Sequence, residues 1–313
     1  MTTPNVLIAA ELQPLVGDQP IPGFAVRWLA ATEPTPAGDY EAFVPLLSRP
    51  VGEDELRGLP QLRIVANCAV GVDNIDLAAC RRRGIHVTNT PDVLTDSTAD
   101  LTWLLILGAA RRAKEGIALL EHDEWQGWDP TLLLGMELKG RALGLVGAGR
   151  IGQAVGRRAA GFAMHLLYNA PTANLEFERE TQAQRVDLTV LLERSDIVSL
   201  HCPLTETTRL LMNAERLGLM RAGSILVNTA RGELVDEPAL LSALASGHLA
   251  AAGLDVFWNE PRVSRTLIEH PRVFAVPHIG SATHETRRAM AALAIGNVRA
   301  VLAGDAPLTP VIQ

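Results

Sequence analysis

Short apolar runs alternate with helix-compatible segments along the whole chain. The first runs are NVLIAA at residues 5–10, RIVANCA at 63–69 and IHVTNT at 85–90, and each has the length of a buried strand. Such alternation predicts an α/β fold with a mostly parallel sheet. We expect these three strands to form a first α/β unit of roughly a hundred residues.

A long helical pattern follows, STADLTWLLILGAARRAKEGIALLEH at residues 97–122. It starts among residue types that cap helices, and its length predicts one helix able to cross between two domains. Its most apolar part, LTWLLILGAA at 101–110, is about half the length needed to span a bilayer. We therefore interpret it as a buried helix.

A glycine motif comes next. Residues 142–146 form an apolar strand, and Gly147, Gly149 and Gly152 then make the pattern GxGxxG. A helix through about Phe162 and a second strand, HLLYN at 165–169, complete a βαβ unit. In this context the glycines allow a tight turn, close approach of a pyrophosphate and close packing of helix on strand, so the unit predicts a dinucleotide site.

The end of the second strand departs from the usual NAD pattern. A carboxylate there normally accepts the ribose hydroxyl groups of NAD, but this chain has Asn169. Asparagine can hydrogen-bond a ribose and does not repel a 2′-phosphate. Arg179 lies ten residues further on, so the choice between NAD and NADP stays open at this point.

Three later strands end next to residues that can do chemistry. SILVNTA is followed by Arg231, AAGLDVF leads to Glu260, and VFAVP is followed by His278. Ligands of open α/β sheets bind beyond the carboxyl ends of the strands, so we expect these three side chains to converge on the cofactor. His284 lies inside a helical pattern, and we assign it to a helix surface.

Composition limits the function classes. With 313 residues, 48% hydrophobic and 20% charged, the chain is long enough for two domains. A net charge of -7 argues against a nucleic-acid surface. The three cysteines are widely spaced, no metal-ligand cluster emerges, and the N-terminus has no basic leader, so we expect a cytoplasmic protein with no metal and no membrane partner.

Several ordered segments together resemble the D-isomer-specific 2-hydroxyacid dehydrogenases. The similarity covers about residues 45–310, and TPDVLTD at 90–96 and EWQGWDP at 124–130 resemble the glyoxylate and hydroxypyruvate reductase branch. The segments that carry the resemblance are VGVDNID (70–76), VTNTPDVLTDSTAD (87–100), GLVGAGRIGQAVGRRAAGF (144–162), LHCPLTETT (200–208), LVNTARGELVDEPAL (226–240), AAGLDVFWNEP (251–261) and PHIGSAT (277–283).

The resemblance implies a split domain. A Rossmann-type doubly wound parallel sheet, residues 97–286, would be inserted into a smaller flavodoxin-like α/β substrate-binding domain, residues 1–96 and 287–313. The active site would lie in the cleft between the domains, where closure excludes water. The resemblance also implies a homodimer formed through the cofactor domain.

The family's reaction suggests a role for each strand-end residue. When NADH or NADPH reduces a 2-oxoacid, negative charge develops on the ketone oxygen, so a proton donor and a cation are needed nearby. His278 suits the general acid and base, Glu260 would orient its ring and favour the imidazolium, and Arg231 would bind the carboxylate and carbonyl.

The resemblance adds further site residues. For the substrate it implies the backbone at Val70 and Gly71, the hydroxyl of Ser281, and Trp128 as a wall that favours small 2-oxoacids. For the cofactor it implies Asp255 at the nicotinamide carboxamide, together with Thr98, Arg150, Ile151, Asn169, Cys202, Pro203, Thr229 and the three glycines.

Two alternatives remain from the sequence. One is another enzyme of the family, such as a phosphite or phosphoglycerate dehydrogenase, since the catalytic trio is similar. The other is a dinucleotide-sensing, corepressor-like binding protein on the same fold. The sequence leaves open which 2-hydroxyacid is physiological and the direction of the reaction.

Overall fold

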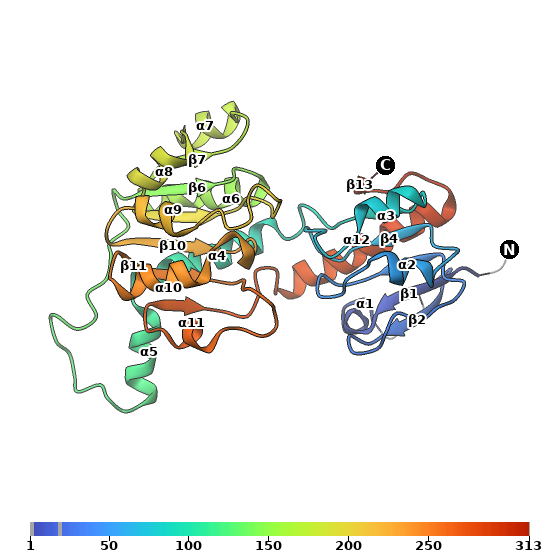
Figure 1. The fold of residues 1–313 in the computed structure, drawn as a ribbon, viewed down its shortest axis with the longest axis horizontal. Coiled ribbons are helices and arrows are strands. Elements are labelled where there is room, and N and C mark those ends of the chain that lie inside the picture. The colour runs from blue at the N-terminus through green and yellow to red at the C-terminus, as the bar shows by residue number, and fades with distance from the viewer. Residues whose placement is uncertain (1–2, 18–20, 313) are drawn as a thin grey trace. The chain divides into compact units, whose positions relative to one another are not determined.

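The computed structural model describes residues 3–17 and 21–312, and the chain divides into two compact units (Figure 1). The first unit comprises Met1–Leu94 and Ser281–Gln313, and the second comprises Thr95–Gly280. Each unit contains its own sheet with helices on both faces. The predicted α/β class is confirmed.

The sheet of the first unit has six strands in the order β13-β5-β4-β3-β1-β2. The first five strands of the chain pair in parallel, and only β13 runs antiparallel, along β5. This is the doubly wound order of a flavodoxin-like sheet with one added edge strand. The strands are β1 (Asn5–Ala9), β2 (Ala25–Leu29), β3 (Ala42–Val44), β4 (Ile64–Ala66), β5 (His86–Thr88) and β13 (Pro310–Ile312).

Helices cover this sheet on both faces. The core on one face joins Leu56 of α2 and Cys80 of α3 to Leu7, Phe43 and Val65 of the strands. The long helix α12 returns from the end of the chain and packs on α1, β3 and β4. The helices are η1 (Ala10–Leu12), α1 (Gln13–Val16), α2 (Glu53–Arg57), α3 (Leu77–Arg82) and α12 (His284–Ala303).

The sheet of the second unit has seven parallel strands in the order β12-β11-β10-β9-β6-β7-β8. The order reverses beside β6, which places a topological switch point at the glycine motif. The strands are β6 (Ala142–Val146), β7 (His165–Asn169), β8 (Gln184–Arg185), β9 (Ile197–Leu200), β10 (Ser224–Asn228), β11 (Leu249–Leu254) and β12 (Val273–Ala275). The strand predictions at 142–146 and 165–169 are confirmed to the residue.

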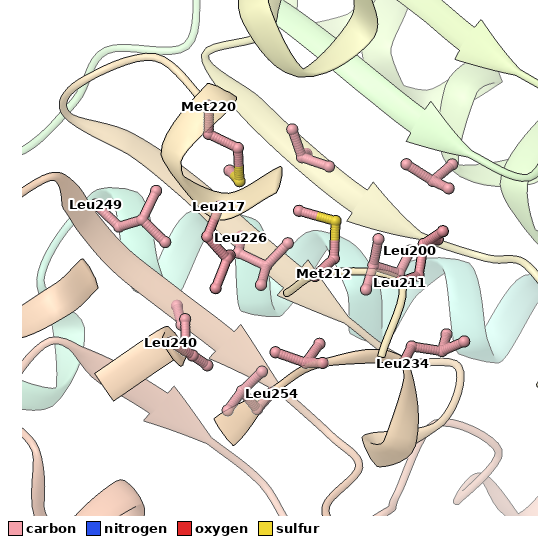
Figure 2. Packing of buried hydrophobic residues seen from close by; sticks show 14 of the residues in the cluster. Leu200, Leu211, Met212, Leu217, Met220, Leu226, Leu234, Leu240, Leu249 and Leu254 are labelled. Carbon is pink, nitrogen blue, oxygen red and sulfur yellow. The ribbon is translucent and has the colours of Figure 1, made fainter. Parts of the chain in front are cut away.

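Two apolar cores fill the faces of this sheet. Trp103, Val155 and Phe177 belong to the core under α4, α6 and α7. The other core, under α8, α9 and α10, is rich in leucine and includes Met212 and Met220 (Figure 2). The helices are α4 (Thr95–Ala110), α5 (Ala113–Glu121), α6 (Arg150–Ala159), η2 (Ala160–Phe162), α7 (Leu175–Thr181), α8 (Leu188–Arg194), α9 (Ala214–Leu219), η3 (Gly232–Leu234), α10 (Glu237–Ala245) and α11 (Arg265–Glu269).

The prediction of a single long helix over residues 97–122 is wrong. The segment forms α4 and α5, and Arg112 between them has a left-handed φ of 53°. The carbonyl of Ala110, which a continuing helix would bond to residue 114, instead accepts the N–H of Met136 at 2.8 Å. Residues 111–135 therefore leave α4 and return to its end, and in Figure 1 α5 and the following loop project away from the sheet.

No helix within residues 3–17 and 21–312 has the length and apolar character required to traverse a bilayer. Over the same described residues, histidine, cysteine and carboxylate side chains form no group of three suited to hold a metal ion. Cys68, Cys80 and Cys202 are free thiols.

Candidate active site

The glycine loop after β6 is built by close backbone contacts. Gly147 has a φ of +96°, and its N–H donates to the carbonyl of Asn169 at 2.9 Å. A Cβ added at Gly147 would lie 2.7 Å from the backbone N of Cys202, and one at Gly152 would lie 2.2 Å from the carbonyl oxygen of Gly147. These two glycines are therefore required by the loop itself.

Gly149 differs from its neighbours because a Cβ there would meet no protein atom within 4 Å. It is the N-cap of α6, whose first turn contains Arg150 and Ile151, and no side chain caps this helix. The N-terminus of a helix is a common binding position for an anion. The internal packing does not require a glycine at this position. The open space over a helix N-terminus fits the pyrophosphate of a dinucleotide.

The end of β7 fixes Asn169 beside the glycine loop. Its side-chain Nδ2 donates to the carbonyl of Val186 at 3.0 Å, which leaves the amide oxygen as the acceptor that a ribose hydroxyl would need. Arg179, considered from the sequence, lies in the last turn of α7. A different cation, Arg185 at the end of β8, donates to the carbonyls of Ala170 and Pro171 at 3.0 and 2.7 Å. Sequence reasoning missed it, since only strand pairing brings it here.

The residues after β9 lie on the other side of the glycine loop. Cys202 and Pro203 lie two and three residues past the end of this strand, and burial raises the pKa of the Cys202 thiol to about 11. This thiol is therefore protonated at neutral pH and is no nucleophile. The preceding His201 is bonded through Nε2 to the Ser199 hydroxyl at 2.9 Å, and burial lowers its pKa to about 4.

Two of the implied cofactor residues are linked through a third that the sequence did not indicate. The Thr102 hydroxyl donates to the carbonyl of Thr98 at 2.8 Å and lies 3.1 Å from the hydroxyl of Thr229. This contact joins α4 to the segment that follows β10 and precedes Arg231. The sequence signal for this contact was the spacing of four residues between Thr98 and Thr102, which places the two side chains on one face of a helix.

The catalytic candidates meet at the carboxyl ends of β10, β11 and β12. His278 Nδ1 lies 2.6 Å from Glu260 Oε2, and the backbone N–H of Phe257 donates to Glu260 Oε1 at 2.9 Å. Each oxygen of the Glu260 carboxylate is thus held by one hydrogen-bond partner. The pairing orients the imidazole and leaves its Nε2 for another partner. His278 itself has a left-handed φ of 51°, an uncommon conformation for a residue with a side chain.

Arg231 belongs to the same group. Its Nη1 donates to the carbonyl of Ala230 at 2.7 Å. A Cβ at the next residue, Gly232, would lie 2.1 Å from the carbonyl carbon of Phe257, so the Arg231 segment packs directly on the segment that precedes Glu260. Partial burial acts to raise the pKa of Glu260, but His278, the Phe257 N–H and the charge of Arg231 outweigh it, and the pKa is lowered. The carboxylate is ionised at neutral pH.

Asp255 holds the turn that carries the histidine. Its carboxylate oxygens accept the N–H groups of Ile279 at 2.7 Å and Gly280 at 2.9 Å, and its carbonyl accepts the N–H of His278 at 2.8 Å. The side chain is 1% exposed, and burial raises its pKa to about 6 against the opposing backbone hydrogen bonds. This organising role was not evident from the sequence.

The remaining candidates lie elsewhere. Val70, Gly71 and Ser281 belong to the first unit, where the N–H groups of Val70 and Gly71 have no acceptor among the described residues. Trp128 lies in the loop after α5 and is 85% exposed. His284 is the exposed first residue of α12, which confirms its assignment to a helix surface.

Comparisons with known proteins identify the family of this chain. The model of the NAD binding domain of D-isomer specific 2-hydroxyacid dehydrogenases matches residues 103–280. A glyoxylate reductase of Thermococcus litoralis is 46% identical over 273 residues, which cover 86% of this chain and 82% of that protein.

Two solved structures are similar over nearly their whole length. One is an NADPH-dependent glyoxylate/hydroxypyruvate reductase of Sinorhizobium meliloti in complex with NADP and malonate, with a TM-score of 0.87, 32% identity, and coverage of 99% of this chain and 97% of that chain. A glyoxylate reductase of Paecilomyes thermophila has a TM-score of 0.85, 31% identity and 99% coverage of both chains. The chain therefore belongs to the D-isomer-specific 2-hydroxyacid dehydrogenases, and it is an NAD(P)-dependent oxidoreductase.

Proposed function

We propose that this protein reduces a small 2-oxoacid, glyoxylate or hydroxypyruvate, to the D-2-hydroxyacid with NADH or NADPH. The observation that carries the proposal is the hydrogen-bonded pair of His278 and Glu260, 2.6 Å apart, with Arg231 packed beside it. The names of the similar reductases support this substrate class.

The roles follow from the charges that develop in the reaction. The chemistry that the bound cofactor supplies is a hydride for the ketone carbon. His278 donates a proton from Nε2 to the ketone oxygen, while Glu260 holds Nδ1 and stabilises the imidazolium before transfer. Arg231 binds the substrate carboxylate and stabilises the developing charge with its planar pair of donors.

We propose further contacts to the substrate and the cofactor. The N–H groups of Val70 and Gly71 would bind the carboxylate, because they lack an acceptor among the described residues of their unit. Ser281 would place a hydroxyl at the substrate. Thr98, Thr229, Cys202, Pro203 and Asp255 would contact the cofactor at the same sheet edge as the glycine loop. A cytoplasmic location remains a prediction.

The test is a panel of substrates with both cofactors, followed by absorbance at the nicotinamide band. We expect glyoxylate and hydroxypyruvate to be reduced with higher kcat/KM than branched or aromatic 2-oxoacids. Oxidation of phosphite or 3-phosphoglycerate with equal or greater kcat/KM would instead assign one of the two alternative activities. Dinucleotide binding without turnover of any substrate would favour the corepressor-like alternative.

The segment of α5 and the loop that follows it supports a homodimer. Between residues 113 and 137 the chain exposes a series of large apolar side chains, namely Ile117, Leu120, Trp125, Trp128, Leu132 and Leu134. Large apolar side chains exposed together along one segment are typical of a protein interface. We propose that a second copy of the chain covers it, which light scattering would detect as a doubled mass.

Trp128 offers a sharper hypothesis within that dimer. It would reach the partner's substrate site and form a wall that favours small 2-oxoacids over bulky ones. In Trp128→Ala, the preference for hydroxypyruvate over bulkier 2-oxoacids should then fall while the dimer persists. A dimeric variant with its full preference would leave Trp128 as an interface residue alone.

A further inference from the structure

We propose that Arg185 binds the 2′-phosphate of NADP and gives this protein a preference for NADP over NAD. The inference rests on the proposed dinucleotide site and concerns a residue on β8, outside the glycine motif. It is carried by where the strand pairing places Arg185 and by what surrounds it.

Strand pairing brings Arg185 to the adenosine end of that site. β8 is parallel to β7, and Arg185, the last residue of β8, is in register with Tyr168. The residue after Tyr168 is Asn169, whose carbonyl accepts a hydrogen bond from the N–H of Gly147 at 2.9 Å. Arg185 and the glycine loop therefore lie on opposite sides of the position where the ribose of a dinucleotide is bound in this fold.

The surroundings of that position suit a phosphate better than a pair of free hydroxyl groups. Asn169 replaces the carboxylate that would repel a 2′-phosphate, and residues 170–174, Ala-Pro-Thr-Ala-Asn, contain no acidic side chain. The Glu178 carboxylate on α7 accepts a hydrogen bond from the Tyr168 hydroxyl at 2.6 Å, and this contact holds the carboxylate at Tyr168.

Arg185 is held at this loop without being neutralised. Its Nε and Nη2 donate to the carbonyls of Ala170 and Pro171, and its only hydrogen-bond partners among the described residues are these uncharged groups. A guanidinium has five N–H donors, so three remain. The residue is exposed, and its planar donors match a phosphate in geometry and charge.

Arg179 is the matched comparison, because it is an arginine in the same βαβ unit. It lies in the last turn of α7, which runs back from the carboxyl edge of the sheet toward the start of β8. Arg185 instead lies at the carboxyl end of β8 itself. Of these two arginines, Arg185 is the one that is hydrogen-bonded to the loop after β7.

The test is titration calorimetry of NADP⁺ and NAD⁺, which differ only in the 2′-phosphate, without substrate. The wild-type protein should bind NADP⁺ more tightly. Arg185→Gln should weaken NADP⁺ binding by about 10- to 100-fold and change NAD⁺ binding less than about threefold. Arg179→Gln should leave both affinities unchanged, and added KCl should weaken NADP⁺ binding more in the wild type than in Arg185→Gln.

The outcomes separate this inference from the proposed function. A wild-type protein that binds NAD⁺ at least as tightly as NADP⁺, or an Arg185→Gln variant that weakens both equally, would overturn the role of Arg185 and leave the dinucleotide site standing. A wild-type protein that binds neither would overturn both. Melting temperatures of the two variants identify any loss of affinity that comes from unfolding.

Discussion

The two halves of the sheet edge in the second unit are built in different ways. At β6 and β7 the contacts come from the main chain: Gly147 bonds the carbonyl of Asn169, and Gly149 leaves space over a helix N-terminus. At β10 to β12 the contacts come from charged side chains, above all the pair of Glu260 and His278. The first half suits an anionic ligand held by backbone, and the second suits proton transfer.

A histidine lies in each half of the sheet edge, but only the one beside β12 suits proton transfer. His201, at the end of β9, is neutral above a pKa of about 4 because it is buried, and its ring is bonded to Ser199. His278 is partly exposed and is paired with an ionised carboxylate. Only the second histidine has the partner and the access that a general acid needs.

The largest expected effect is on the charged half. His278→Ala removes the proton donor, so we expect kcat to fall by about a hundredfold or more while dinucleotide binding stays nearly unchanged. Steady-state kinetics and calorimetry measure the two quantities. His284→Ala is the control, because that side chain lies exposed at the start of α12, and it should retain kcat. Near-normal turnover in His278→Ala would refute the assignment.

The next effect concerns Arg231, whose segment packs on the one before Glu260. Arg231→Lys keeps the charge but loses the planar pair of donors, so kcat/KM for 2-oxoacids should fall by about 10- to 100-fold. Dinucleotide affinity should not change, since the other half of the edge is untouched. An unchanged kcat/KM would mean that the substrate carboxylate is bound elsewhere.

The two halves differed in how far the sequence predicted them. The glycine motif is local: three glycines, a strand and a helix fall within about thirty residues, and the spacing alone predicted their arrangement. The charged group comes from three separate strands, and it was predicted only because parallel strands end at one edge.

Other features depended on tertiary contacts. Nothing in the sequence around Arg112 marks the helix break, because its cause is the hydrogen bond from Met136, 26 residues past Ala110, to the Ala110 carbonyl. The position of Arg185 depends on the register of β7 and β8. The carboxylate contacts of Asp255 join it to residues 24 and 25 positions away.

A smaller effect tests the backbone half. Gly149→Ala adds a methyl group that meets no protein atom within 4 Å, so the fold should not change. The methyl would occupy the space over the helix N-terminus, and we expect dinucleotide affinity to fall roughly tenfold. Gly161→Ala is the matched control, because its added Cβ is equally unobstructed and it lies in η2, just past the other end of α6. Equal affinities in the two variants would contradict the assignment of Gly149.

The last test of the charged half is the pH dependence of stability that Asp255 should cause. Burial raises the pKa of Asp255 to about 6 from a usual value of 3.8. The folded protein therefore binds this proton more firmly than the unfolded chain does. As pH rises from about 4 to about 6, the unfolded chain ionises freely and the folded state does not, so stability falls across that window. Since one pKa unit corresponds to about 1.4 kcal/mol, the contribution is about 3 kcal/mol at most.

Asp255→Asn removes this titration and keeps one carbonyl oxygen for the N–H of Ile279 or Gly280. We expect the wild-type melting temperature, relative to that of the variant, to be highest near pH 4 and to decline by several degrees by pH 6 to 7. Taking the difference between the two proteins at each pH cancels the titration of groups that do not interact with Asp255. A difference that does not vary with pH would mean that the Asp255 carboxylate keeps its charge throughout, and that the N–H groups of residues 279 and 280 outweigh its burial.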